Sequence, residues 1–388
     1  MRLKKVTSLP PQAERVWQVA IHPTLPLIAT ASSDKTARII SLQTYNSLST
    51  IEGGHKRSIR SVAWKPGLTG ESVLCTGSFD ATIGIWRRYE HDLDTGNSQL
   101  EGGDEEEEEW RFALVLDGHE SEVKSVAWSA GGNFLATCSR DKTVWIWEEI
   151  DEDNFETLEV MQEHTQDVKC VAWHPEEVLL ASSSYDNTIR LYREGSEDWV
   201  CCSLLEGHTA TVWTVEFEKP ASPGYRGEWG SRLASCSDDL SIKVWTRISR
   251  SGSAAEAKKA PPSILRGESI EENWVETSTL PQVHTRAIYK VSWSSRSGRI
   301  VSCASDGRIV VYKEISSVDT EMAERDEKKP QMTEWKVVAE IEGAHGVFEV
   351  NCVQWSKRWD KDAKGENDEV IVSCGDDGVV SVWELADA

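Results

Sequence analysis

The chain has 388 residues, of which 18 are tryptophan, and it carries a formal net charge of −23. This acidic excess argues against unaided binding to nucleic acid or to anionic membranes, because their phosphates would be repelled by most of the surface. No apolar run of about 18 residues or more occurs, and residues 1–12 lack the apolar stretch of a signal peptide. We therefore expect a soluble cytoplasmic and nuclear protein that binds other proteins.

Short segments in which apolar and polar residues alternate recur along the chain, as expected for half-buried β-strands. A first strand is expected at residues 3–9. Seven repeats follow, at about residues 14–52, 55–93, 119–163, 164–206, 208–280, 284–341 and 345–388.

Each repeat has an Asp in a predicted tight turn and a large apolar residue six positions later. The pairs are Asp34 with Ile40, Asp80 with Trp86, Asp141 with Trp147, Asp186 with Tyr192, Asp239 with Trp245, Asp306 with Tyr312, and Asp377 with Trp383. Six of the pairs are preceded by a His, namely His55, His119, His164, His208, His284 and His345. The first repeat has Gln12 at that position.

A period of roughly 40 to 45 residues with a Gly-His to Trp signature is typical of WD-repeat β-propellers. We predict an all-β, seven-bladed propeller in which residues 1–388 form a single domain. The last repeat ends soon after Trp383 without an outer strand of its own. We therefore expect the N-terminal strand at residues 3–9 to close the last blade, which would leave no open sheet edge there.

Inserted loops interrupt the repeats at about residues 94–109, 219–231, 249–272, 314–334 and 357–369. The first ends in a run of acidic residues and is followed by an expected outer strand at 110–116. All of them fall at turns between strands, where longer loops add little entropic cost. We expect solvated surface loops, and a specific role for the acidic run stays open.

The repeated His and Asp residues could suggest a catalytic site. In this fold, however, such residues form a buried hydrogen-bond network within each blade. We expect His119, Asp141 and Trp147, with Ser139 or Thr137, to form one network. The equivalent residues of the second repeat are His55, Asp80 and Trp86. Because the same constellation recurs in six repeats and no catalytic motif occurs, we predict that the protein is not an enzyme.

The nine Cys residues follow the repeat, and no C-x-x-C motif is present. Cys138, Cys236, Cys303 and Cys374 each precede a turn Asp by three residues, while Cys170 and Cys352 share another repeat position. This pattern favours small buried side chains over metal ligands or disulfides. We predict no metal site and no cofactor bound by this chain.

In the WD-repeat propellers that these repeats resemble, three positions in each blade line the upper face around the central channel. Residues before the first Val or Ile of the inner strand are Arg15, Ser58, Glu122, Asp167, Thr211, Ala287 and Glu349. Residues after it are Trp17, Arg60, Lys124, Lys169, Trp213, Tyr289 and Asn351. Residues before the turn Asp are Ser33, Phe79, Arg140, Tyr185, Asp238, Ser305 and Asp376.

Cations and aromatic residues stand out among these positions. The cations lie on neighbouring repeats two to four, and they are Arg60, Lys124, Arg140 and Lys169. The aromatic residues, expected to be exposed on the same rim, are Trp17, Phe79, Tyr185, Trp213 and Tyr289. Such a surface suits an acidic or carboxylate-bearing peptide with an aromatic anchor. The alternative is that these are ordinary solvated rim residues. Arg140 is the strongest candidate, because Arg can hold a carboxylate with two parallel hydrogen bonds.

Several segments closely resemble the WD-repeat component of the cytosolic iron-sulfur protein assembly machinery, and in particular a fungal member. They include HKRSIRSVAWKP, GHESEVKSVAWS, LATCSRDKTVWIWE, EHTQDVKCVAWHP and AHGVFEVNCVQW. The resemblance implies a scaffold in the targeting complex that hands iron-sulfur clusters to cytosolic and nuclear apoproteins. Its implied partners are a small MIP18-like acidic adaptor, a large HEAT-repeat targeting protein and an iron-only-hydrogenase-like cluster carrier.

The same resemblance assigns importance to an Arg on the upper face, and the motif SRDK places it at Arg140. It also implies recognition of the C-terminal tails of client apoproteins or adaptors that end in an aromatic residue. In this interpretation the chain presents partners to each other and holds no cluster itself.

Two other classes of binding protein remain as alternatives. A chromatin or histone-tail reader would need an acidic upper face, so the predicted cations count against it. A cullin ubiquitin-ligase receptor commonly carries W-D-x-R, whereas the Trp residues here precede Arg87, Glu148, Thr246 and Glu384. An enzyme is the third alternative and would have to turn over a substrate without partners.

Overall fold

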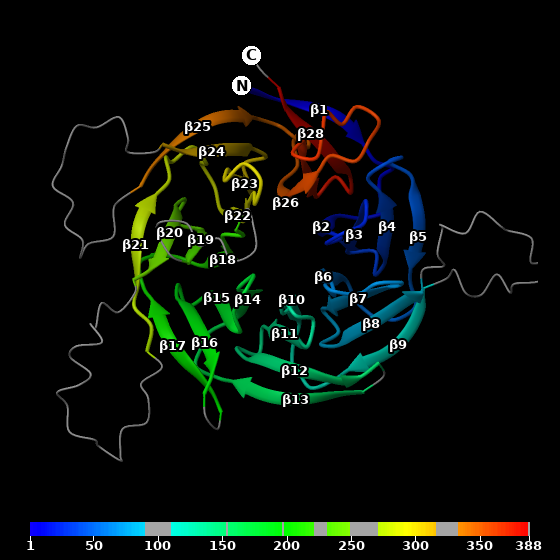
Figure 1. Cartoon of the computed structure of the whole chain (residues 1–388), viewed down its shortest axis with the longest axis vertical. Coiled ribbons are helices and arrows are strands. Elements are labelled where there is room, and N and C mark those ends of the chain that lie inside the picture. Colours follow the sequence, from blue (N-terminus) through cyan, green and yellow to red (C-terminus); the bar gives the residue numbers. More distant parts are fainter. Residues whose placement is uncertain are drawn as a thin grey trace, which may run out of the picture.

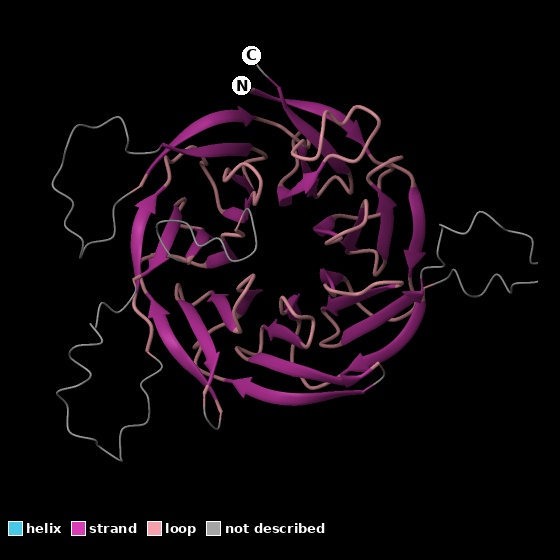
Figure 2. Ribbon diagram, viewed as in Figure 1, coloured by secondary structure: helices cyan, strands magenta, loops and turns pink. Residues whose placement is uncertain are grey.

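The computed structural model describes residues 1–89, 110–152, 154–195, 198–220, 231–248, 271–315 and 333–386. Every regular element in these residues is a strand, and the strands form seven four-stranded sheets. Figures 1 and 2 show the sheets arranged around a central axis as the blades of a propeller. The predicted all-β, seven-bladed propeller is confirmed. Within the described ranges no helix has the length and apolar character needed to cross a membrane.

Blades one to six each take four consecutive strands, beginning with the innermost. Blades one to three contain β2 (Val16–Ile21), β3 (Leu27–Ser32), β4 (Ala37–Ser41), β5 (Ser47–Ile51), β6 (Ile59–Trp64), β7 (Glu71–Ser78), β8 (Ile83–Tyr89), β9 (Arg111–Leu116), β10 (Val123–Trp128), β11 (Phe134–Ser139), β12 (Val144–Asp151) and β13 (Asn154–Met161).

Blades four to six contain β14 (Val168–Trp173), β15 (Leu179–Ser184), β16 (Ile189–Glu194), β17 (Trp199–Leu205), β18 (Val212–Phe217), β19 (Arg232–Ser237), β20 (Ile242–Arg247), β21 (Trp274–Thr279), β22 (Ile288–Trp293), β23 (Ile300–Ala304), β24 (Ile309–Ile315) and β25 (Glu334–Ile341). Blade seven contains β26 (Val350–Lys357), β27 (Glu369–Gly375), β28 (Val380–Ala386) and β1 (Arg2–Ser8).

The N-terminal strand closes the ring, as predicted. β1 is antiparallel to β28, with a register that runs from Arg2 opposite Ala386 to Ser8 opposite Ser381. Figure 1 shows both ends of the chain at this blade. Because blade seven draws strands from both ends of the chain, its sheet holds the circle together without an additional covalent link.

The predicted inserted loops fall mainly outside the described residues. The range 94–109 lies wholly outside them, and most of 219–231, 249–272 and 314–334 does too. Residues 314 and 315 belong to β24 and residue 334 to β25, so that predicted loop reached into strands. The loop predicted at 357–369 is described, but Lys357 and Glu369 pair across β26 and β27, because the two strands extend further than the repeat pattern indicated.

A β-bulge interrupts the inner strand of every blade near its start. The register with the second strand shifts there by one residue, which has no partner in the ladder. The bulged residues are Trp17, Arg60, Lys124, Lys169, Trp213, Tyr289 and Asn351. A bulge re-aims the side chain of its extra residue. The same backbone feature therefore sets the direction of seven side chains around the ring.

The turn between the second and third strands of each blade depends on its Asp. In blade three Asp141 Oδ1 accepts hydrogen bonds from the Thr143 amide (2.9 Å) and hydroxyl (2.6 Å). The residue between them, Lys142, adopts a positive φ of 74°. Blades six and seven place Gly307 and Gly378 at this position, where glycine takes the left-handed conformation without steric cost.

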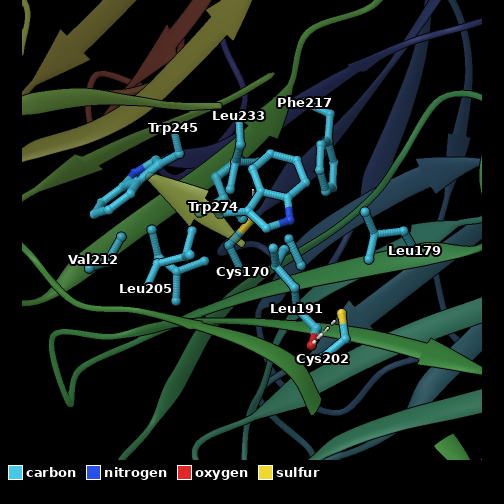
Figure 3. Packing of buried hydrophobic residues seen from close by; sticks show 13 residues of the cluster. Cys170, Leu179, Leu191, Cys202, Leu205, Val212, Phe217, Leu233, Trp245 and Trp274 are labelled. Carbon is cyan, nitrogen blue, oxygen red and sulfur yellow. Dashed lines mark hydrogen bonds between the residues drawn. The ribbon is translucent and has the colours of Figure 1, made fainter. Parts of the chain in front are cut away.

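The core consists of apolar clusters between neighbouring blades. Figure 3 shows the cluster that joins blades four and five, in which Trp245 and Trp274 pack with Phe217 and Leu233. Cys202 lies in the same cluster and its thiol donates to the Leu191 carbonyl (3.3 Å). Full burial of one such large side chain contributes about 1.5–3 kcal/mol. Repeated at each blade junction, this packing gives a rigid frame for the residues around the axis.

Candidate functional site

The residues that recur in the repeats, namely His, Asp, Thr or Ser, and Trp, form a chain of hydrogen bonds inside the blade. In blade three the Trp147 indole N–H donates to Thr137 Oγ1 (3.0 Å), and that hydroxyl lies 2.9 Å from His119 Nε2. His119 Nδ1 lies 2.8 Å from Asp141. Thr137 is therefore the network member, whereas Ser139 donates to the Ser121 carbonyl (3.0 Å). His119 is only 5% exposed, so the network is a structural element inside the blade.

Blades two, five and seven keep this arrangement in full. Blades four and six keep the His, Ser and Asp but have Tyr192 and Tyr312 in place of the Trp. In blade two Trp86 donates to Thr76 (3.0 Å), and His55 lies between Thr76 and Asp80. Blade one has no His, and Gln12 donates to Thr30 Oγ1 instead (2.7 Å).

These networks shift the acidity of the turn carboxylates. Burial alone would raise the pKa of Asp141, but hydrogen bonds from His119 and Thr143 outweigh it and hold the pKa well below its usual range. In the same way burial would raise the pKa of Asp306, but the His284 ring and neighbouring amides outweigh it and lower the pKa to about 2. Since the folded-state pKa values are depressed, these groups stabilise the fold above about pH 4 and lose that effect as the pH falls towards 2.

The inner strands of all seven blades enclose a cavity of about 640 Å³, which we call the channel. All seven bulged residues line it. We use the name upper face for the face of the ring that carries the turn Asp residues. The bulges thus bring together seven of the residues that the sequence placed on this face, from Trp17 in blade one to Asn351 in blade seven.

Three neighbouring bulged residues, Arg60, Lys124 and Lys169, are the channel cations. Each lies over an aromatic ring: Arg60 is 5.0 Å from the centroid of Trp17, and Lys124 is 4.4 Å from that of Phe79. Lys169 lies between Tyr185 (5.1 Å) and a second ring, that of Trp213 (5.2 Å). The Lys169 side chain is only 11% exposed, so the channel cations are recessed.

Arg140 lies apart from the channel lining, at the rim of the upper face. Its side chain is 59% exposed and approaches the Glu122 carboxylate at 3.4 Å. Arg57, which is 57% exposed, approaches the same carboxylate at 3.6 Å and donates to the Phe79 carbonyl (2.7 Å). We call Arg57 and Arg140 the rim arginines. Exposed guanidinium groups held by a shared acid are well placed to bind a carboxylate on a partner.

The sequence did not identify Arg57. Its position, two residues before Ile59, is outside the three positions taken from the repeat pattern. The two loop residues that follow each His would have supplied the signal, since this loop forms the rim.

Two expectations about this surface need correction. The four predicted cations do not form one group, because Arg140 stands on the rim and the other three line the channel. Of the five aromatic residues expected to be exposed, only Tyr185 is, at 49%. The others, Trp17, Phe79, Trp213 and Tyr289, are half-buried. They pack against the cations and against each other: the Trp17 and Phe79 centroids are 6.1 Å apart, and those of Trp213 and Tyr289 5.1 Å.

The bulged residues of blades five to seven are held by acids. Trp213 donates to Asp238, Tyr289 to Glu349 (2.9 Å) and Asn351 to Asp376 (2.8 Å). Burial and the Glu349 carboxylate raise the pKa of Tyr289 to about 12, so its hydroxyl stays a donor. These hydrogen bonds satisfy the carboxylate oxygens in part, but the donors are neutral, so negative charge remains on this side of the upper face. Asp376 also has an ion-pair partner, Arg15, at 3.3 Å.

The cysteines occupy the interior as predicted. All nine are free, eight are buried, and Cys201 is half-buried. Burial raises the pKa of Cys75 and Cys138 well above the usual value. In the part of the chain that is described, no three His, Cys, Asp or Glu residues are grouped so that they could hold a metal ion.

Comparison with known proteins matches this geometry to a family. The profile of the WD domain, G-beta repeat, matches residues 3–41, 45–87, 110–148, 155–193, 199–246, 274–313 and 335–384. A protein of Aspergillus flavus named probable cytosolic iron-sulfur protein assembly protein 1 is 49% identical, over 97% of this chain and 96% of its own length. This chain belongs to the cytosolic iron-sulfur protein assembly protein 1 family of WD-repeat propellers.

Relatives with the same name in other fungi show the same extent of similarity. The protein of Phaeosphaeria nodorum is 50% identical over 98% of this chain and 95% of its own length. That of Penicillium rubens is 47% identical over 97% of this chain and 96% of its own. The family resemblance inferred from the repeat segments is thereby confirmed, and it extends over the whole propeller.

Proposed function

We propose that this protein is a non-catalytic scaffold of the cytosolic iron-sulfur protein assembly targeting complex. It docks an adaptor, a cluster carrier and client apoproteins, so that iron-sulfur clusters reach cytosolic and nuclear proteins. The names of the relatives support a role in this assembly in the cytosol. The proposed partners are a MIP18-like adaptor, a HEAT-repeat targeting protein, an iron-only-hydrogenase-like carrier, and the C-terminal tails of clients. The cluster is cargo, and it passes between partners while this chain holds them in place.

The observation that carries the proposal is the pair of rim arginines around Glu122. Each arginine side chain is more than half exposed, while the Glu122 side chain is only 13% exposed. Burial raises the pKa of Glu122, but the Ser121 hydroxyl, its own amide, Lys124 and Arg140 together lower it, so it remains an anion that orients the arginines. Each guanidinium has five N–H donors, more than Glu122 and the Phe79 carbonyl use, so donors remain for a partner carboxylate. Half-buried aromatic rings beside it, Phe79 and Trp17, provide an apolar surface for an aromatic anchor.

This charge pattern also separates the proposal from its alternative, a peptide-binding adaptor of another complex such as a chromatin reader or a ubiquitin-ligase receptor. A basic tail would meet the rim arginines and channel cations in blades two to four, and like charges would repel it.

The test is affinity purification of the tagged wild-type chain and of the Arg140→Glu variant from cells. Arg140 is exposed and its ion pair is weak, so the substitution should change the stability by less than about 1 kcal/mol. It should reduce recovery of clients or of the carrier by about tenfold or more. Arg286→Glu is the control, because it makes the same charge reversal at an exposed arginine of blade six, at the position that Arg57 occupies in blade two. Equal recovery of all partners by the two variants would move the docking site away from the rim arginines.

A further inference from the structure

The channel cations have too few acidic partners for their number. Lys169 lies 3.4 Å from Asp167. For Arg60 and Lys124, none of the carboxylates in the described ranges comes within 4.0 Å. Lys290, which also lines the channel, has Glu216 at 3.8 Å. Partly buried charges without a counter-ion are costly, so blades two to four carry a cost that blade six avoids.

The aromatic rings offset only part of this cost. A cation over a ring gains about 0.5–2 kcal/mol, depending on how far it is desolvated. Each ring covers one side of its cation, and the cation also borders the channel cavity of about 640 Å³. Since the residues on three neighbouring blades all border one cavity, an anion there can reach more than one of them.

Among the channel cations, Lys124 shows the cost of an unpaired, partly buried charge most clearly. Burial, together with the charges of Lys169 and Arg60, lowers the pKa of its ammonium group to about 8, although Glu122 and Asp167 act in the opposite direction. Phe79 covers the remaining side and carries no charge. The lowered pKa supports what the geometry indicates, namely that positive charge has accumulated at this end of the channel.

We propose that the channel between Arg60, Lys124 and Lys169 is a binding site for a small oxyanion that carries two or more negative charges, such as a polyphosphate or a tricarboxylate. The site suits a small ligand because its cations are recessed: the Lys169 side chain is 11% exposed, whereas the rim arginine Arg140 is 59% exposed. A folded partner would meet the rim first and leave the channel to a freely diffusing anion. This site goes beyond the scaffold role and does not depend on it.

Calorimetric titration of the full chain at low ionic strength and pH 8 tests the proposal. Cyclic trimetaphosphate and citrate are the probes, since both are fully ionised at this pH and do not exchange protons themselves. The wild-type chain should bind at least one of them with proton uptake of up to about half a proton, detected by comparing buffers of different ionisation enthalpy. Binding of only one probe distinguishes a phosphoryl from a carboxylate ligand.

Variants locate the site. Lys124→Met should weaken binding by about tenfold or more, because a hydrogen bond between charged groups is lost. Lys124→Arg should retain binding without the proton uptake, since arginine does not titrate in this range. Lys313→Met, which removes an exposed cation from β24, should bind as the wild type does. The proposal is overturned if the wild type binds neither probe, if Lys124→Met binds equally well, or if Lys313→Met weakens binding as much.

The outcome is independent of the scaffold role. If an Arg140→Glu chain loses its partners but still binds the anion, the channel site is supported and is separate from the docking site. If a Lys124→Met chain loses the anion but still recovers all its partners, the scaffold role does not require the channel site.

Discussion

The two sides of the upper face are built on the same backbone and have opposite electrostatics. In blades two to four the bulged residues are Arg60, Lys124 and Lys169, and they lie against aromatic rings. In blades five to seven the bulged residues are Trp213, Tyr289 and Asn351, and each donates to an acid beside it. One side satisfies its polar groups internally, while the other leaves positive charge for a ligand. The bulge sets the direction of the side chain in every blade. The residue type then decides whether that position offers a charge to a ligand or donates to a neighbouring acid.

The largest effect that we expect comes from removing Lys290, the cation of blade six that lines the channel. Unlike Arg60 and Lys124, it has an acidic partner. Lys290→Met removes the recessed ammonium group 3.8 Å from the Glu216 carboxylate and leaves that carboxylate only the exposed Lys219, also at 3.8 Å. Although burial lowers the pKa of Lys290, Glu216 outweighs it and the net shift is upward, as expected for a working ion pair. We expect a loss of about 2–3 kcal/mol in the free energy of unfolding, measured by urea titration. A stability equal to that of the Lys313→Met control would mean that the pair contributes nothing.

A smaller loss is expected where an acid holds an aromatic residue. Tyr289→Phe removes the donor to Glu349 and leaves that carboxylate less well solvated. The free energy of unfolding should fall by about 1–2 kcal/mol. Tyr185→Phe is the matched control on the cationic side, where the ring is 49% exposed and contacts Lys169 through its face. If both variants lost the same amount, the acids of blades five to seven would not be holding their donors.

The smallest effect has the opposite sign. Lys124→Met removes an ammonium group that has no carboxylate within ion-pair distance among the described residues, and the thioether can still pack on Phe79. In the absence of multivalent anions we expect the variant to be more stable by about 1 kcal/mol at pH 7.

This gain should shrink as the pH rises. The pKa of Lys124 is about 8 in the folded chain and near 10.4 when unfolded, so between these values the unfolded state binds more protons and the wild type gains stability with pH. Urea titrations of both proteins at pH 7 and pH 10 measure the difference. A variant less stable than the wild type at pH 7 would contradict the view that Lys124 lacks a counter-ion.

Much of the fold could be predicted from the sequence, because the repeat signature combines a fixed spacing with a specific chemistry. His119, Asp141 and Trp147 occur at positions that only this hydrogen-bond network explains, and the missing outer strand after Trp383 indicated closure by the N-terminus. The bulged residues were also accessible, since each is adjacent to the first Val or Ile of its inner strand.

What the sequence could not supply was the pairing of charges. Whether Lys124 has a counter-ion depends on its distances to Glu122 in its own blade and to Asp167 in blade four, which follow from the local backbone and from the packing of the two blades. Trp17 and Trp213 likewise contact cations on a neighbouring blade, Arg60 and Lys169. Arg57 was missed because the three repeat positions used for the prediction leave out the loop that follows the network His.

The central claim is that partners dock on the cationic side of the upper face. Hydrogen–deuterium exchange of the chain alone and in the purified complex measures this most directly. The account predicts new protection at the rim loops of blades two and three, around residues 55–60, 119–124 and 140–142. Protection confined to blades five to seven or to the outer strands would contradict it.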